Sequence, residues 1–228
     1  MSAAARSGTL EEGQVRAMFD RIAGPYDLMN SVMTAGLHHR WRSRAADLAR
    51  VGPGSRALDV ATGTGDLAIE LASRGAAVVG SDFSEGMLAR ARAKAPELRW
   101  ERADAMALPY ADGEFAAATV GFGARNFADL GQGLREMVRV VRPGGRVVVL
   151  EITTPRKPPL SIFYSIWFDR LVPLLGRFDE AYSYLPHSVK RFPGPEALAG
   201  LVADAGCREV GWILTAGGII ALHYGTVA

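Results

Sequence analysis

Short apolar runs alternate with amphipathic stretches through the middle of this 228-residue chain. The apolar runs have the length of buried strands, and they lie at residues 56–60, 77–81, 98–102, 115–122 and 145–152. Apolar positions at helical spacing fill the gaps between them, at residues 66–73, 84–94 and 130–140. This alternation predicts βαβ units and a parallel sheet. The turn at residues 142–145, with one proline and two glycines, is expected to separate the third helix from the fifth strand.

The pattern changes after residue 152. Segment 153–193 is dense in aromatic and aliphatic residues and is interpreted as an apolar insertion. A helix is expected at residues 195–205, followed by two β-like runs at 209–214 and 219–224. The turn at residues 216–218 is too short for a crossover, so these two runs predict an antiparallel hairpin.

Two amphipathic helices precede the repeating part of the chain. Apolar side chains recur at helical spacing from Val15 to Ile22, and a second helix is expected from Leu37 onwards. We expect these helices, within residues 14–50, to cover the open face of the core, and residues 1–13 to form a flexible tail. The chain, 1–228, is therefore interpreted as one α/β domain with a mostly parallel sheet of about seven strands.

Composition excludes several classes of protein. The formal net charge is only +2 and the basic residues are dispersed, so a nucleic-acid surface is not expected. The one cysteine, Cys207, permits neither an intramolecular disulfide nor a cysteine-based zinc site, and no metal is expected. No signal-peptide core and no stretch of about 18 uncharged apolar residues occurs. We expect a cytoplasmic protein, and the sequence carries no indication of its oligomeric state.

A glycine-rich turn follows the first strand and leads into a helix. Residues 59–66 read Asp-Val-Ala-Thr-Gly-Thr-Gly-Asp, and glycines such as Gly63 and Gly65 let the backbone approach a ligand closely. Asp82 ends the second strand, near the spacing at which a carboxylate accepts hydrogen bonds from a ribose. The loop predicts a nucleotide or nucleoside site. The alternatives are a plain βα turn and, for Asp82, a helix cap shared with Ser84.

The charges beside this loop discriminate between two cofactors. Asp59 and Asp66 bracket the loop, and a carboxylate about 4 Å from a pyrophosphate costs on the order of 4 kcal/mol per charge pair. S-adenosylmethionine carries a sulfonium and an ammonium, which favour acidic neighbours, and its one carboxylate could bind loop amides. The acidic flanks therefore favour S-adenosylmethionine over a nicotinamide dinucleotide. Asp104 and Ala105 follow the third strand, where an adenine would lie if Asp82 binds the ribose.

These motifs together resemble class I S-adenosylmethionine methyltransferases, which have a Rossmann-like α/β fold. Three further segments resemble the quinone C-methyltransferases of the menaquinone and ubiquinone pathways: residues 18–30, residues 121–126 (Gly-Phe-Gly-Ala-Arg-Asn) and residues 215–223 (Thr-Ala-Gly-Gly-Ile-Ile-Ala-Leu-His). The resemblance implies methylation of a ring carbon of a prenylated quinol. It also implies cofactor contacts at Thr64, Asp82, Asp104, Ala105 and Gly121, the last through its backbone.

Methyl transfer to the ring of a quinol needs a group that handles the hydroxyl proton, because a phenol-like hydroxyl has a pKa of about 10. Arg125 is the first candidate, as an oxyanion partner, and Asn126 is expected to orient Arg125 or the ring. The alternative is that Arg125 forms a structural ion pair with an acid such as Asp129. Weaker candidates for acid or base are Tyr26, Asp27, His38, Tyr182 and His187.

The apolar insertion at 153–193 has two interpretations. It is either core packing over the sheet or an entrance for a prenyl tail, with peripheral attachment to a membrane. Other functions also remain open: methylation of a benzoquinol or of another acceptor on oxygen or nitrogen, a nicotinamide-dependent oxidoreductase, and a non-catalytic cofactor-binding module. The sequence favours methylation of a naphthoquinol in menaquinone biosynthesis only weakly over its benzoquinol counterpart.

Overall fold

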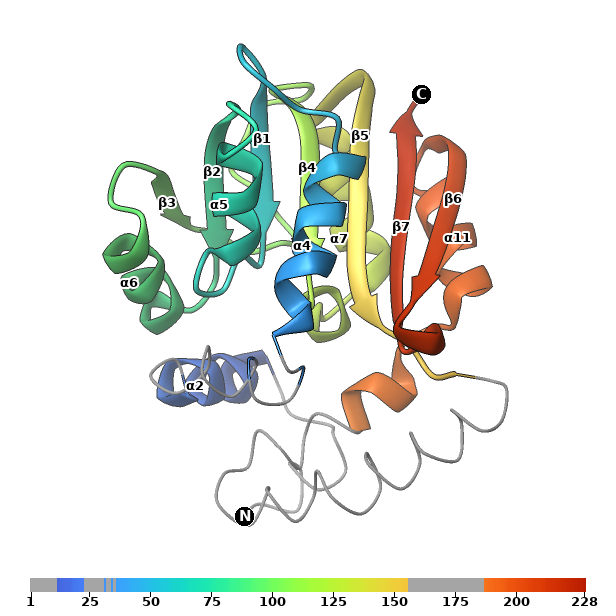
Figure 1. Ribbon diagram of the computed structural model, residues 1–228, viewed down its shortest axis with the longest axis horizontal. Helices are drawn as coiled ribbons and strands as arrows, with labels where there is room; N and C mark the ends of the chain where they lie inside the picture. Colours follow the sequence, from blue (N-terminus) through green and yellow to red (C-terminus); the bar gives the residue numbers. More distant parts are fainter. Residues whose placement is uncertain (1–11, 23–30, 32–33, 35, 156–186) are drawn as a thin grey trace.

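The computed structural model describes residues 12–22, 31, 34, 36–155 and 187–228, in which seven strands form one sheet flanked by helices (Figure 1). The strands are β1 (Arg56–Val60), β2 (Ala77–Asp82), β3 (Arg99–Arg102), β4 (Phe115–Gly121), β5 (Val141–Ile152), β6 (Cys207–Thr215) and β7 (Ile220–Val227). The helices are α2 (Glu12–Ile22), α4 (Leu37–Leu48), α5 (Asp66–Ala72), α6 (Glu85–Lys94), α7 (Leu130–Arg139) and α11 (Pro195–Asp204), with short 3-10 turns η1 (Ala124–Asn126) and η3 (Ala216–Gly218).

The sheet has the order β3-β2-β1-β4-β5-β7-β6. The first five strands pair in parallel, and β7 lies antiparallel between β5 and β6. The predicted mostly parallel sheet with an antiparallel C-terminal hairpin is confirmed. Because β1 is flanked by β2 and β4, the carboxyl ends of these three strands meet at one edge of the sheet, where ligands bind in open α/β folds.

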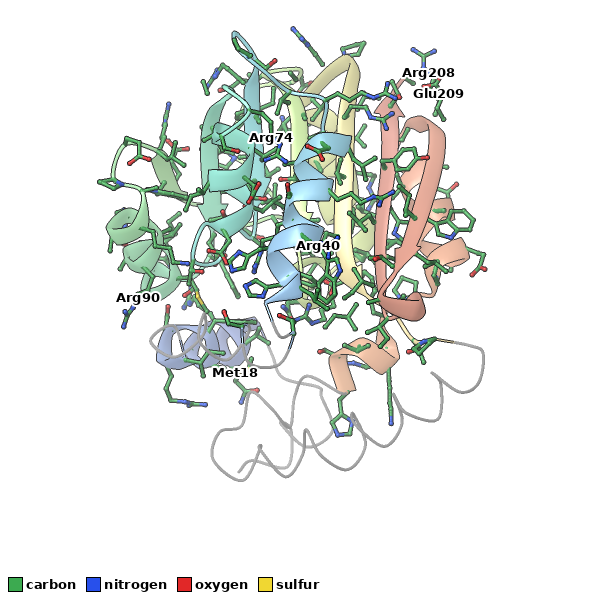
Figure 2. All side chains as sticks on the ribbon, in the orientation of Figure 1. Met18, Arg40, Arg74, Arg90, Arg208 and Glu209 are labelled. Carbon is green, nitrogen blue, oxygen red and sulfur yellow. The ribbon has the colours of Figure 1, made fainter. Side chains whose placement is uncertain are left out.

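Helices cover both faces of the sheet (Figure 1). One face carries α4, α5 and α6, whose buried alanines and leucines form one hydrophobic core with the strands. The other face carries α7 and α11 over a second core. Helix α4 packs on this face over β4 and β5, beside α5. Arg74 joins the two helices, since its guanidinium bonds Asp47 at 2.8 Å and the carbonyl of Ser43 at 2.8 Å (Figure 2).

Helix α2 does lie across the carboxyl edge of the sheet, as expected (Figure 1). Its apolar stripe of Val15, Met18 and Ile22 packs against Met87 of α6. Asp20 accepts hydrogen bonds from the Ser84 hydroxyl at 2.5 Å and from the Gly86 amide at 3.0 Å. Helix α2 is therefore fixed to the start of α6 both by apolar packing and by a capping carboxylate.

One detail differs from the sequence-based expectation. Residues 142–145 do not separate α7 from β5 but lie inside β5, whose pairing with β4 shifts register between Phe115 and Ala117. Gly144 takes a φ of +78° there, so the strand absorbs the predicted turn as an irregularity. Most of the predicted insertion at 153–193 lies outside the described residues, as do residues 1–11 of the predicted tail.

Candidate active site

The glycine-rich loop between β1 and α5 is fastened by its own amides. The amide of Thr62 donates to the Ser81 carbonyl at 2.9 Å, and that of Gly65 donates to the Thr62 carbonyl at 3.0 Å. The amide of Gly63 donates to Oδ2 of Asp82 at 2.8 Å. Ala61, Gly63 and Gly65 all have positive φ, so the loop turns sharply in a conformation that two glycines adopt without strain.

Trp100 of β3 supports this loop from the side. A Cβ on Gly65 would lie 2.5 Å from the Trp100 ring, and a Cβ on Gly80 would lie 2.3 Å from it. The indole N–H donates to the Ala95 carbonyl at 2.8 Å, which fixes the ring. Gly65 is thus required for close packing against the ring as well as for its backbone conformation, with a φ of +88°.

Asp59 lies near the end of β1 with its carboxylate fully enclosed. Its two oxygens accept hydrogen bonds from the hydroxyls of Thr62 at 2.5 Å and Thr119 at 2.6 Å. Burial raises the pKa of Asp59 to about 6, although the two hydroxyls and the Arg42 guanidinium partly oppose that rise. The enclosed carboxylate would be stabilised as an anion by a positively charged ligand.

Asp82 ends β2 beside the loop. Its carboxylate accepts hydrogen bonds from the amides of Gly63 at 2.8 Å and Ser84 at 2.9 Å, and burial raises the pKa of Asp82 to about 6. The predicted helix cap is Ser84 itself, whose hydroxyl accepts from the Met87 amide at 3.1 Å. Ser84 is thus the cap residue of α6, while the Asp82 carboxylate holds the Ser84 amide and joins the glycine-rich loop to the second strand.

A single pocket at this edge collects most of the predicted site residues. Its walls include Asp59, Gly63, Thr64, Asp82, Asp104, Ala105, Gly121 and Asn126. Gly65 and Arg125 are not among the lining residues. Asp66, which was expected to flank the loop, also lines the pocket, and so do residues that the sequence did not indicate: Phe19, Arg42, Phe83, Met87, Met106, Phe122 and Phe127. The lining therefore combines aromatic residues with four carboxylates, Asp59, Asp66, Asp82 and Asp104, which we call the acidic wall.

Phe19 and Arg42 enter this pocket from α2 and α4, outside the βαβ units. Helical periodicity predicted that both helices bury one face, but it gave no information on which part of the core that face contacts. Arg42 is buried, which is unusual for an arginine, but its burial is a finding of the structure and nothing in the sequence identified it as a site residue.

Arg125 and Asn126 lie in η1, just after β4. The Arg125 guanidinium donates to Oε1 of Glu151 at 2.6 Å, and it also bonds the Phe122 carbonyl. Both side chains of the Arg125–Glu151 ion pair are buried. Asp129, named as a possible partner, instead accepts from the Gln132 amide at 2.9 Å and caps α7. That Arg125 contacts a quinol oxygen remains a prediction.

Asn126 faces the pocket with an unused acceptor. Its Oδ1 atom is buried and has no hydrogen-bond partner among the described residues. An unbonded buried amide oxygen is costly, and a ligand with a hydroxyl or amine would satisfy it. Of the weaker candidates, His38 is buried with Nδ1 2.6 Å from the Thr34 hydroxyl, and His187 is exposed. Tyr26, Asp27 and Tyr182 lie outside the described residues.

Comparisons with known proteins agree on one family. The model of the ubiE/COQ5 methyltransferase family matches residues 7–227. The chain is 49% identical to a demethylmenaquinone methyltransferase of Thermus thermophilus, over 91% of this chain and 99% of that protein. It is 44% identical to a ubiquinone/menaquinone biosynthesis C-methyltransferase of Geobacter sulfurreducens, over 87% of this chain and 83% of that protein.

Solved structures support the fold. A methyltransferase from Thermotoga maritima, described as a possible histamine N-methyltransferase, superimposes with a TM-score of 0.63. The match covers 93% of this chain and 99% of that one, at 20% identity. At that identity the likeness concerns the Rossmann-like α/β architecture and does not extend to the acceptor.

The enclosed Asp59 carboxylate generates a stability prediction. Its pKa is about 6 in the folded chain against an ordinary 3.8, so ionising it costs stability as pH rises from about 4 to 6. We expect Asp59→Asn to raise the free energy of unfolding above pH 6 by about 3 kcal/mol, the equivalent of a two-unit pKa rise. The two threonine hydroxyls can rotate to serve the new amide.

Urea denaturation from pH 4 to pH 8, without ligand, measures this difference. The gain should be near zero at pH 4 and complete above pH 6. The matched control is Asp204→Asn, which changes an exposed carboxylate of α11 and should show no such trend. If the variant is less stable than wild type at pH 8, the ionised Asp59 carboxylate does not destabilise the fold.

Proposed function

The chain belongs to the ubiE/COQ5 methyltransferase family, and we propose that it methylates a ring carbon of a prenylated quinol, demethylmenaquinol, with S-adenosylmethionine as donor. The observation that carries this proposal is the 49% identity to a demethylmenaquinone methyltransferase over nearly its whole length. Several further demethylmenaquinone methyltransferases are 40–46% identical over most of the chain. The reaction places the chain in menaquinone biosynthesis.

The residues of the pocket fit S-adenosylmethionine. Asp59 and Asp82 are enclosed carboxylates whose raised pKa a cationic ligand would lower, and Asp82 lies where it can accept from a ribose hydroxyl. Asp104 and Ala105 follow β3 and form the adjoining wall, with a carboxylate to accept from an adenine amine and a small side chain to leave room for the ring. When bound, the donor supplies an electrophilic methyl group.

The remaining work of the protein is to position a quinol and to manage its hydroxyl proton. We assign the hydroxyl contact to Asn126, whose buried Oδ1 can accept that O–H and so raise electron density on the ring. Phe19, Phe122 and Phe127 supply an apolar wall that excludes water from the reacting atoms. Correct positioning alone accounts for much of the acceleration in such a transfer.

Arg125 acts on this site through its neighbours. Its guanidinium is bonded to Glu151 and to the carbonyl of Phe122, and both bonds fix the backbone that carries Asn126. The Arg125 amide also donates to Oε2 of Glu151, at 3.3 Å. We therefore propose that Arg125 is a positioning residue whose charge is largely balanced by Glu151, and that direct stabilisation of a quinolate is the competing role.

The alternatives from the sequence have specific observations against them. A nicotinamide dinucleotide would place its pyrophosphate at a loop flanked by Asp59 and Asp66, where like charges repel. A benzoquinol, or an oxygen or nitrogen acceptor, would use the same donor site, so only the acceptor assay separates them. Attachment to a membrane through residues 153–193 remains a prediction; among the described residues no helix is long and apolar enough to span a bilayer.

Labelled methyl transfer tests the proposed function. Purified protein is incubated with donor labelled on its methyl group and with reduced naphthoquinones and benzoquinones that carry prenyl tails. We expect label on the ring carbon of the demethylated naphthoquinol, with much slower labelling of benzoquinols. Label on oxygen or nitrogen, or none on any quinol, would contradict the proposal.

Two substitutions separate contact from positioning at η1. We expect Asn126→Ala to lower turnover by about 10²-fold, the lower end for one well-placed hydrogen-bonding group, without changing the melting temperature. Arg125→Ala should lower turnover and melting temperature together, because it leaves the buried Glu151 carboxylate unpaired.

The pH profile of the arginine variant decides between its two roles. If Arg125 stabilised the quinolate directly, turnover of Arg125→Ala would recover at high pH, where solvent supplies quinolate. We expect no recovery between pH 7 and pH 10. If turnover of Arg125→Ala recovers at high pH and its melting temperature equals that of wild type, Arg125 stabilises the quinolate directly.

A further inference from the structure

Arg42 is the only cationic side chain among the described residues that line the pocket. It comes from the middle of α4, and only 6% of its surface is exposed. A buried arginine is costly unless anions or hydrogen-bond acceptors compensate it. The acidic wall supplies carboxylates nearby, and Arg42 lowers the pKa of both Asp59 and Asp66.

The partners that Arg42 has within the described chain leave part of its guanidinium unsatisfied. Nη1 lies 3.1 Å from Oδ2 of Asp66, and the guanidinium carbon lies 5.7 Å from the centre of the Phe122 ring. Nη1 is nevertheless buried without a hydrogen bond to any described residue, so its contact with Asp66 is ionic and not aligned as a hydrogen bond. A buried donor at the wall of a pocket points to a ligand with an acceptor.

Asp66 does not depend on Arg42 alone. Its other oxygen lies 2.7 Å from Nζ of Lys94, which also donates to the Thr64 hydroxyl at 2.9 Å. If Arg42 binds a ligand anion, Asp66 still keeps a cationic partner. Arg42 can therefore be shared between Asp66 and a ligand without leaving a buried carboxylate unpaired.

The glycine-rich loop offers less to an anion than its sequence suggests. The amides of Thr62, Gly63 and Gly65 are already bonded to a carbonyl or to Asp82. From the sequence we expected that the carboxylate of the donor could bind loop amides. With three of these amides engaged, fewer remain for an anion, and a cationic side chain at the wall of the pocket offers a further partner.

We propose that Arg42 binds the carboxylate of the methionyl part of S-adenosylmethionine, an inference that rests on the proposed function. The charges match in pairs: Arg42 faces the carboxylate, while the acidic wall that includes Asp59 faces the ammonium and sulfonium. Arg42 is thus a cofactor-binding residue contributed by a helix outside the βαβ units. It makes the pocket specific for an amino-acid sulfonium over other adenosyl sulfoniums.

Decarboxylated S-adenosylmethionine isolates this contact, because it keeps the adenosine, sulfonium and amine and lacks only the carboxylate. Calorimetry should show that the wild-type chain binds S-adenosylmethionine more tightly than the decarboxylated compound. We expect Arg42→Met to weaken binding of S-adenosylmethionine by about 10- to 100-fold, the range for a charged hydrogen bond. Binding of the decarboxylated compound should be unchanged or tighter, because a positive charge has been removed.

Arg40→Met is the matched control. Arg40 lies two residues away on α4 and is exposed (Figure 2), so its removal should change neither affinity. Arg42→Lys keeps the charge but loses the planar fork, and it should bind S-adenosylmethionine with intermediate affinity. The comparison of the two ligands on wild-type protein needs no variant and therefore does not depend on whether Arg42→Met folds.

Two results would overturn the assignment while leaving the proposed function intact. One is equal affinity of the wild-type chain for both ligands. The other is an equal loss of both affinities in Arg42→Met, which would indicate a structural role in holding α4. Failure of the wild-type chain to bind either ligand would instead overturn the proposed function, and this assignment with it.

Discussion

The pocket is built around two buried carboxylates, Asp59 and Asp82, at the carboxyl edge of the sheet. Each is satisfied by short hydrogen bonds, Asp59 by two threonine hydroxyls and Asp82 by two backbone amides. These bonds do not offset the cost of burial, since the pKa of each group remains near 6. The fold thus holds negative charge where it is unfavourable without a ligand, and a cationic donor relieves that cost.

The pocket is closed by two helices, α2 and α4, that do not belong to the βαβ units. Helix α2 supplies Phe19 and is held by the bonds of Asp20 to the start of α6. Helix α4 supplies Arg42 and is joined to α5 through Arg74. Because the first residues of α5 and α6 also line the pocket, α2 and α4 are positioned by the same elements that flank the glycine-rich loop.

The strands and helices were predictable because they bury apolar residues with a clear period. Asp59, Asp82, Asp104 and Asn126 were predictable as residues of the pocket because each lies near or after the end of a strand, and strand ends meet at one edge. Arg42 was not, because the face that α4 buries depends on its packing against α5 and the sheet. The partner of Arg125 was missed for a similar reason: Glu151 adjoins it only through the pairing of β4 with β5.

If the enclosed carboxylates form a site for a cation, binding of a cationic ligand should release protons from them. Calorimetric titration with S-adenosylmethionine at pH 6, repeated in buffers of different ionisation enthalpy, counts the protons exchanged. A cation lowers the pKa of Asp59 and Asp82, so we expect release of protons at pH 6 that disappears at pH 8. Uptake of protons at pH 6, or none exchanged while the ligand binds, would contradict it.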